Sequence, residues 1–385
     1  MKREKWLTLG LIIALVMSPV TDVYAQESNG TYETVGSGDY EESQVDDNRN
    51  KESDAKDGAA ENRNIATVSY EGIVGETGKN TTVTGDVTTT GETSDGVTAD
   101  GSNTKVTVKG NVTVSGTGSA GVSANNNATV EVTGNVEAKG DNQTHEGQTG
   151  GTYIDKWADG VEADNGSKVT VDGNVTSQKG WAIDSHGSDV TVNGDVHSEK
   201  GSAINARKGS TITIDGSVSS NAGITLGGII ETTESTIKIT KDVTAKNAWG
   251  ILAGSEADIE VGGNISSEKE AVYIAGKDAL IVVDGNVYST KGCAMDILEQ
   301  AEATVKGDVS GNKLAIWMDN SSKLQALGKI SSNDVGILLS LYGDQGTGEL
   351  ELGTIDAQTA ISINYGEYKD IRLRLAGRYQ IDNAA

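Results

Sequence analysis

The sequence predicts an all-β protein, a single-stranded parallel β-helix (β-solenoid) of about 12–13 coils with a repeat of ~22 residues. A short motif, Val-x-Val-x-Gly-(Asn/Asp)-Val, recurs through most of the chain. Apolar β-branched residues alternate with polar ones in each copy, which is the period of a strand. The composition, with 50 Gly, no Phe and 4% aromatic residues, offers little material for a thick core. Stacked repeats need only a thin one.

The N-terminal segment has the pattern of a secretory signal peptide. Lys2, Arg3 and Lys5 precede an apolar run over 6–17, and small residues end the segment at Ala25. We expect a signal peptide at 1–25 and a protein that is either released outside the cell or associated with the cell surface. The apolar run is too short for a membrane helix, and no later stretch approaches the ~20 residues that one requires. The sequence therefore predicts no membrane span.

An acidic segment separates this leader from the repeats. Residues 26–64 are rich in Glu, Asp, Ser, Asn and Gly and are expected to form a disordered linker. The β-helix domain is expected over 65–385. The formal net charge of −25 argues against nucleic acid as a partner, because such binding requires a basic surface. Cys293 is the only cysteine, so no disulfide within the chain can stabilise the fold.

The clearest copies of the repeat motif are mostly spaced 21 to 25 residues apart, with one interval of 39 residues from Gly134 to Gly173. They read VTVKGNV at 106–112, VEVTGNV at 130–136, VTVDGNV at 169–175, VTVNGDV at 190–196, ITIDGSV at 212–218, IKITKDV at 237–243, IEVGGNI at 259–265 and IVVDGNV at 281–287. A second motif, small-(Ile/Val)-x-(Ala/Ile/Leu), lies between them, so each period holds three short strands. Strands without helical crossovers fit coils wound about one axis. Val108, Val132 and Val171 should then point inward.

The corner glycines introduce the first column of equivalent positions. Glycine before Asn or Asp is expected to allow a positive φ at the turn between two strands. The following residues run along the coils as Asp86, Asn111, Asn135, Asn174, Asp195, Ser217, Asp242, Asn264, Asn286, Asp308 and Lys329. No two acids are neighbours, whereas a calcium column requires adjacent carboxylates. A structural ladder is favoured over a metal site, and no metal or cofactor is predicted.

A second column should face outward from the other motif. It reads Thr98, Ser123, Glu162, Asp184, Asn205, Thr225, Leu252, Tyr273, Asp296, Trp317, Leu338 and Ser362. Glu162 and Asp184 form a carboxylate pair beside the only long interruption of the period, an inserted loop at about 141–157. Candidate ligand-binding residues there are Tyr153, Trp157, Glu162, Trp181 and Asp184. The same acids with His186 would be the catalytic residues of an enzyme, and a solvated loop over exposed acids is the third interpretation.

An aromatic strip in the same column is the second candidate site. Tyr273 and Trp317 could stack on sugar rings or anchor a protein partner. A covering loop, a neighbouring chain or a change of register would instead hide these rings. Because the last repeat ends close to the end of the sequence, an uncapped coil could also favour end-to-end self-association.

The corner and strand motifs resemble those of pectin-lyase-like right-handed parallel β-helices, and especially the repeat regions of bacterial adhesins and autotransporter passengers. The resemblance covers roughly 66–381 and implies a right-handed coil. It implies a structural and glycan- or partner-binding module, with host or bacterial surface glycans or proteins as partners. The alternative is a polysaccharide lyase or glycoside hydrolase. The chain lacks the Asp-Asp and Gly-His-Gly set of polygalacturonases, since Ser185-His186-Gly187 is only a fragment of it, so enzyme activity is uncertain and the balance leans against it.

Overall fold

A computed structural model describes most of the repeat region. The described residues are 61–64, 67–69, 71–146, 152–222, 228–319, 321–340, 348–364 and 372–375. The expected signal peptide and nearly all of the expected linker lie outside them. Residues 61–64, at the end of the range assigned to the linker, form strand β1 (Glu61–Asn64), which pairs in parallel with β4 (Asn80–Thr84).

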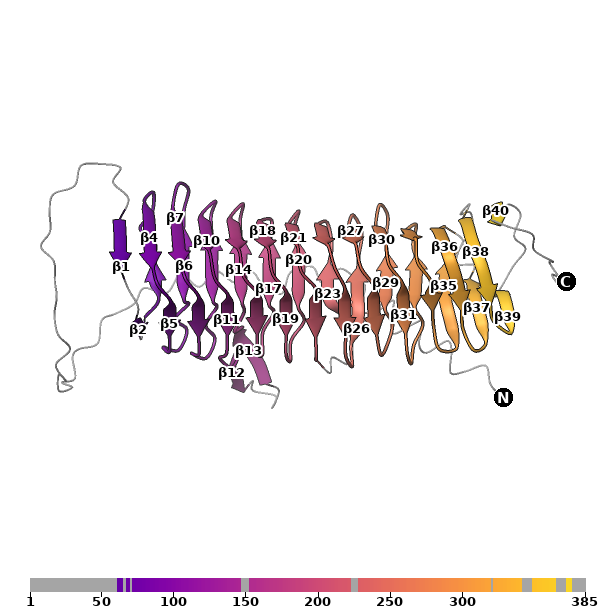
Figure 1. Cartoon of the computed structure of the whole chain (residues 1–385), viewed down its shortest axis with the longest axis horizontal. Helices are drawn as coiled ribbons and strands as arrows, with labels where there is room; N and C mark the ends of the chain where they lie inside the picture. The colour runs from indigo at the N-terminus through magenta and orange to yellow at the C-terminus, as the bar shows by residue number, and fades with distance from the viewer. Residues whose placement is uncertain are drawn as a thin grey trace, which may run out of the picture. The chain divides into compact units, whose positions relative to one another are not determined.

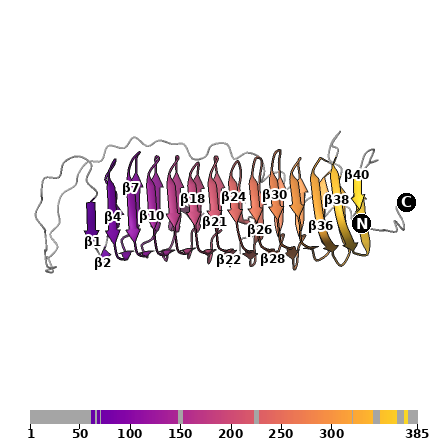
Figure 2. The same ribbon diagram turned by 45° about the horizontal axis from the view of Figure 1, so that its top comes forward.

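The described residues form a parallel β-solenoid and contain no helix (Figures 1 and 2). Two long sheets run along the stack: a 25-stranded sheet, here sheet A, and a 13-stranded sheet, here sheet B. Each strand of sheet B marks one pass of the chain, so 13 strands enclose 13 − 1 = 12 full turns. This confirms the predicted fold class. The right-handed sense of the coil remains a prediction.

Each turn contributes two strands to sheet A and one to sheet B, as the repeat predicts. The strands of sheet B are β3 (Ile73–Val74), β6 (Val97–Asp100), β9 (Val122–Asn125), β14 (Val161–Asp164), β17 (Ile183–His186), β20 (Ile204–Arg207), β23 (Gly228–Thr232), β26 (Trp249–Ala253), β29 (Val272–Ala275), β32 (Met295–Leu298), β35 (Leu314–Asp319), β37 (Val335–Ser340) and β39 (Thr359–Asn364).

Sheet A combines the Val-x-Val strands with the short strands that follow the corner. The Val-x-Val row continues after β1 and β4 with β7 (Lys105–Lys109), β10 (Thr129–Val132), β15 (Lys168–Val171), β18 (Asp189–Val192), β21 (Thr211–Ile214), β24 (Thr236–Ile239), β27 (Asp258–Val261), β30 (Leu280–Val283) and β33 (Glu302–Val305). The short row holds β2 (Thr67–Ser69), β5 (Val87–Thr89), β8 (Val112–Val114), β11 (Val136–Ala138), β16 (Val175–Ser177), β19 (Val196–Ser198), β22 (Val218–Ser220), β25 (Val243–Ala245), β28 (Ile265–Ser267), β31 (Val287–Ser289) and β34 (Val309–Ser310). In the last coils the two rows merge into β36 (Lys323–Ser331) and β38 (Glu349–Asp356), and β40 (Arg372–Leu375) pairs with β38.

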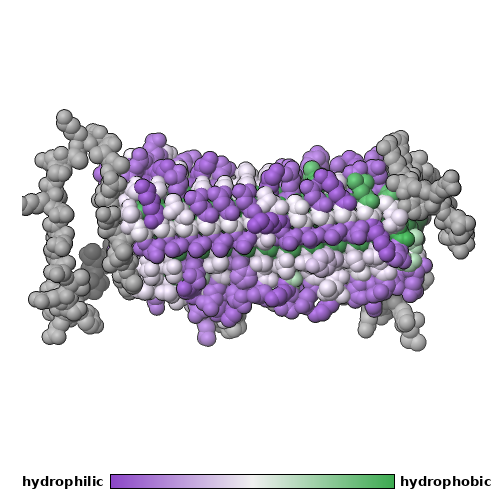
Figure 3. All heavy atoms as spheres, viewed as in Figure 1, coloured by the Kyte–Doolittle hydropathy of each residue, from purple (hydrophilic) through white to green (hydrophobic). Residues whose placement is uncertain are grey.

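The core is a narrow column of Val, Ile and Ala side chains. Val108, Val132 and Val171 have exposed fractions of 0%, 1% and 0%, which confirms that the Val-x-Val positions point inward. Parallel pairing holds them in register, for example Val132 with Val171. Equivalent positions therefore form straight columns, and the surface shows rows of like hydropathy along the stack (Figure 3). Each fully buried Val adds about 1.5–3 kcal/mol to stability.

The corner glycines serve a purpose different from the one predicted. Among these corners only Gly85 has a positive φ, of 110°. A Cβ on Gly134 would lie 2.6 Å from the Gly110 carbonyl oxygen, and one on Gly194 would lie 2.6 Å from that of Gly173. The expected positive φ is therefore wrong for most corners. Glycine is needed there because successive coils approach too closely for a side chain.

The residues after these glycines form the predicted structural ladder. The backbone N–H of Asn135 donates to Asn111 Oδ1 at 2.9 Å, and that of Asn174 donates to Asn135 Oδ1 at 2.8 Å. Asp195 and Ser217 continue the series, both at 2.8 Å. The same bonds resume from Asp242 to Asn264 and onward. The ladder is interrupted at Ser217, whose side chain is shorter than that of Asn or Asp. Among the described residues, no hydrogen bond joins its hydroxyl to the next N–H of the series.

The insertion is a hairpin rather than an irregular loop. Its strands β12 (Gln143–Glu146) and β13 (Thr152–Lys156) pair antiparallel and interrupt the chain between β11 and β14. Around it the ladder is unbroken, because β10 and β15 pair directly although 39 residues separate Val130 from Val169. The 39-residue spacing seen in the sequence thus marks an excursion from one coil.

Candidate binding site on the outer face of sheet B

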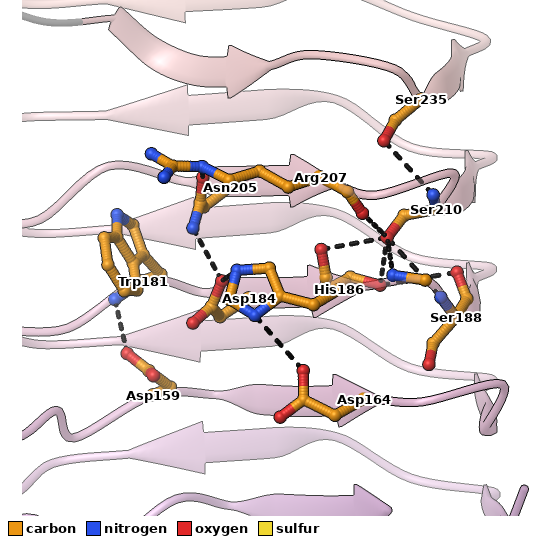
Figure 4. Close-up of polar contacts among 12 residues, drawn as sticks. Asp159, Asp164, Trp181, Asp184, His186, Ser188, Asn205, Arg207, Ser210 and Ser235 are labelled. Atoms are coloured by element: carbon orange, nitrogen blue, oxygen red, sulfur yellow. Dashed lines mark hydrogen bonds and ion pairs between the residues drawn. The ribbon is translucent and has the colours of Figure 1, made fainter. Parts of the chain in front are cut away.

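Seven side chains gather on the outer face of sheet B where the hairpin returns to the coil. We call this set the acidic face; it comprises Trp157, Asp159, Glu162, Asp164, Trp181, Asp184 and His186. β14 supplies Glu162 and Asp164, and β17 supplies Asp184 and His186. Pairing of these strands aligns Glu162 with Asp184 and Asp164 with His186. Figure 4 shows five of the seven on adjacent coils.

Strand alternation places the acids on the outside. Val161 and Ala163 are fully buried in the core, whereas Glu162 and Asp164 between and after them are half-buried on the outer face. Ile183 and Ser185 repeat this inward pattern one coil later. The sequence motif therefore determines which face carries the carboxylates, as predicted for Glu162 and Asp184.

A polar chain connects three coils across this face (Figure 4). His186 Nδ1 lies 3.3 Å from Asp164 Oδ1, and His186 Nε2 lies 3.4 Å from Asp184 Oδ1. Asn205 Nδ2 donates to Asp184 Oδ1 at 2.7 Å. Arg207 Nε donates to Asn205 Oδ1 at 3.0 Å. These contacts orient Asp184 and place His186 between two carboxylates.

Two tryptophans border the acids. The Trp157 and Trp181 ring centroids are 4.6 Å apart, with their planes at 31°. The backbone N–H of Trp181 donates to Asp159 Oδ1 at 2.7 Å. Asp159 is only 4% exposed. Sequence reasoning identified both tryptophans as ligand-binding candidates but not their contact with each other.

Burial and like charges favour the neutral form of the carboxyl groups. Burial first, and then the charges of Asp164 and Asp95, raise the pKa of Glu162 to about 7. Burial and the nearby Asp184 raise the pKa of Asp159 well above its usual value. The pKa of Asp184 is also raised by burial, against the opposing charge of His186. The hydrogen bond with Asp164 raises the pKa of His186.

The hairpin is anchored beside the acidic face. Lys156 Nζ forms an ion pair of 2.9 Å with Asp95 Oδ1, and Asn142 Oδ1 accepts the Ala158 N–H at 2.9 Å. Tyr153 lies on the exposed strand β13, 53% exposed, and its ring stacks on His145 at 5.6 Å. The candidate residue Tyr153 is therefore accessible, but its ring contact is within the hairpin.

The aromatic strip is more closed than the sequence suggested. Tyr273 is 3% exposed and stacks on Trp249 with centroids 5.6 Å apart. Trp317 is half-buried, and its Nε1 donates to Ser340 Oγ at 2.8 Å. Asp296, between them in the column, has one buried carboxyl oxygen without a hydrogen-bond partner. Because the Tyr273 ring is buried against Trp249, it presents no open face to a ligand.

One member of the predicted outward column is misplaced. Thr225 lies outside the described residues, and pairing of Ile204 with Ile230 gives its position to Glu231. The sequence motif did not identify strand β23, because Ile229 stands at the position where the motif has a small residue. Glu231 is half-buried, and burial raises its pKa.

Three further polar residues of this region were missed by sequence reasoning: Asp159, Asp164 and Arg207. Asp164 and Arg207 occupy the outward position two residues after the column that contains Glu162 and Asn205. Asp159 lies two residues before the buried Val161. Strand alternation alone would turn its side chain inward, but the chain bends at Gly160 between the two residues. A second outward column, aligned in the same way, would have found Asp164.

Comparisons of the chain with protein-family models, with curated proteins and with solved structures found no match. The described segments include no helix with the length and apolar character to cross a membrane. Among the described residues, no group of three or more His, Cys, Asp or Glu side chains is arranged to hold a metal ion.

Proposed function

We propose that the chain is a secreted or cell-surface β-solenoid that acts as an adhesin-like module and binds glycans through the acidic face. The observation that carries this proposal is the Trp157–Trp181 pair, with ring centroids 4.6 Å apart, next to Asp159. Glu162 lies close enough to Asp159 to affect its pKa. Aromatic rings stack on the apolar faces of sugars, and carboxylates accept hydrogen bonds from hydroxyl groups. Glu162 is held by strand β14, and the two tryptophans and Asp159 lie in the segments that lead into β14 and β17.

The location of this face also supports a binding role. It lies next to the hairpin, the one long insertion among otherwise regular coils. Insertions on a regular scaffold are common places for function. Glycans or glycoproteins of host or bacterial surfaces are the partners that fit a secreted protein with the expected signal peptide at 1–25.

Removing one tryptophan tests the proposal. A panel of oligosaccharides is screened for binding to the full chain, and the tightest ligand is titrated against Trp181→Ala. We expect affinity to fall about tenfold, ~1.4 kcal/mol. Trp249→Ala is the matched control, because Trp249 occupies the equivalent position on a later coil. Retained affinity in Trp181→Ala, or an equal loss in both variants, would refute binding at the acidic face.

The alternative function, a polysaccharide lyase or hydrolase, is favoured by one observation. Glu162 has a pKa of about 7, which suits a general acid at neutral pH. Release of reducing ends from the same oligosaccharide panel would reveal turnover. Glu162→Gln should then lower the rate by about 100-fold or more, while Glu231→Gln, in the same column, should leave it unchanged. If no oligosaccharide is cleaved, the enzyme proposal fails.

A further inference from the structure

The acidic face has more carboxyl groups than cations to balance them. The cations close enough to affect the pKa values of this face are Lys156, His186, Arg207 and Lys208, against its four carboxyl groups and Asp95. Lys156 pairs with Asp95, and Arg207 donates to Asn205. His186 lies between Asp164 and Asp184. Within the described part of the chain, no hydrogen bond or ion pair ends on the Glu162 carboxylate.

Asp159 offers one carboxyl oxygen to a ligand. Most of its side chain is buried, at 4% exposure, and Oδ1 accepts the Trp181 N–H. Among the described residues no hydrogen bond ends on the other carboxyl oxygen, and this oxygen is not one of the sealed, unsatisfied atoms of the solenoid. A hydrogen-bond donor of a ligand can therefore reach it in place of solvent.

The neighbouring rings favour a positively charged donor. Trp157 and Trp181 present aromatic faces beside Asp159, and indole is the best aromatic partner of a cation. A protonated amine would donate to a carboxylate and contact the ring face together. An anionic sugar would meet mainly like charges at Glu162, because the carboxylates of Asp164 and Asp95 act with burial, the largest cause, to raise the pKa of Glu162.

We propose that the acidic face selects glycans with free, protonated amino groups over neutral and anionic glycans. This inference rests on the proposed glycan-binding function and specifies its ligand class. The ammonium group of a 2-amino sugar lies between Glu162, Asp159 and the tryptophan pair, and the sugar ring stacks on an indole. Acetylation of the amine removes the charge and the specific contact.

Calorimetric titration of the full chain with three matched oligosaccharides tests this inference. The probes are oligomers of glucosamine, N-acetylglucosamine and galacturonic acid of equal length, at an ionic strength of about 0.15 M. We expect the glucosamine oligomer to bind at least about tenfold more tightly than the acetylated one, and the galacturonic acid oligomer not to bind.

Site variants separate a built site from general attraction to an acidic protein. Glu162→Gln and Asp184→Asn should each remove most of the preference for the amine. Asp189→Asn is the matched control, because Asp189 is an exposed acid of the same coil on sheet A. If Asp189→Asn weakens binding as much as Glu162→Gln, diffuse charge explains the preference and the inference is wrong.

The remaining outcomes distinguish the two proposals. Equal or tighter binding of the acetylated oligomer would overturn the amine inference and leave glycan binding intact. Absence of binding by any oligomer, here and in the wider panel, would refute the proposed function itself. Circular dichroism of each variant verifies that the solenoid is folded before it is titrated.

Discussion

Single residues at the corners of this solenoid contact the equivalent residue of the next coil. A carbonyl oxygen of Gly110 limits what can stand at position 134, and Asn111 Oδ1 satisfies the N–H of Asn135. The same relation is repeated at almost every corner. A substitution at a corner therefore disturbs two coils, whereas one in an isolated turn disturbs only its own backbone.

The corner glycines give a prediction at this scale. Gly134→Ala should destabilise the protein by about 2 kcal/mol, because its Cβ would lie 2.6 Å from the Gly110 carbonyl oxygen. Gly209→Ala is the control. Its φ is +80°, but a Cβ there would lie 4.0 Å from its nearest neighbour, the Glu234 carbonyl oxygen. We therefore expect the free energy of unfolding to fall by only about 1 kcal/mol. Urea unfolding measures both. Equal costs would contradict coil-to-coil crowding at the corner.

Buried carboxyl groups give a second prediction. Burial raises the pKa of Asp296 to about 7, well above that of an unfolded aspartate. Above about pH 4 the folded state therefore keeps a proton that the unfolded state releases. The contribution of protonated Asp296 to the free energy of unfolding is complete below about pH 4 and is lost as the pH rises to about 7. The loss is on the order of several kcal/mol.

Unfolding midpoints between pH 4 and pH 8 measure this effect. Burial raises the pKa of the neighbouring Tyr273 and Cys293 above their usual values, so neither titrates in this range. The charge of Glu270 adds to the rise in the pKa of Asp296. Asp296→Asn should flatten the profile, because its side chain does not titrate. A residual slope of the same sign remains from the other acids whose pKa is raised by burial, which are Asp159, Glu162, Asp184 and Glu231. A wild-type protein that grows more stable from pH 4 to pH 8 would contradict the assignment.

At the scale of strands, prediction from the sequence succeeded where a repeat was regular. Copies such as VTVDGNV at 169–175 carry alternation, corner and ladder residue together, so they located strands and inward positions. The segment LQALGKI at 324–330, a weaker match to the motif, lies within one long strand, β36, whose pairing with β38 contains a register shift. The hairpin at 143–156 was anticipated as an insertion but not as paired strands, because its alternation is short and exposed on both faces.

The candidate site was only partly predictable for a similar reason. Glu162, Asp184 and His186 follow from alignment of equivalent positions. The Trp157–Trp181 contact depends on how the hairpin returns to the coil, which the repeat does not encode. Tyr273 and Trp317 were rightly placed in an outward column, but the extent to which Trp249 and Ser340 pack against them depends on side-chain rotamers.

The hairpin gives a prediction at the scale of elements. Because β10 and β15 pair directly across its base, replacing 144–155 with a short glycine linker should change the free energy of unfolding by less than about 1 kcal/mol. Thermal unfolding followed by circular dichroism would show a midpoint within ~2–4 °C of the wild type. A much larger fall would mean that the hairpin supports the coils around it.

At the scale of the whole solenoid, function depends on coils stacking in register. Glu162 and Asp184 are neighbours only because Val161 pairs with Ile183. A shift by one residue would turn every acid of β14 into the core. The thin core of Val and Ile, the corner ladder and parallel pairing all favour this single register.

Engineered disulfides test that register most directly. In a Cys293→Ser background, cysteines replacing Thr170 and Thr191 occupy paired positions on adjacent coils, about 4.8 Å apart and within bonding range. Cysteines at Thr170 and Thr213 are two coils apart, ~9.6 Å, beyond that range. The stacked solenoid predicts rapid oxidation of the first pair within the folded monomer and none of the second. Oxidation of the second pair but not the first would contradict the register on which the acidic face depends.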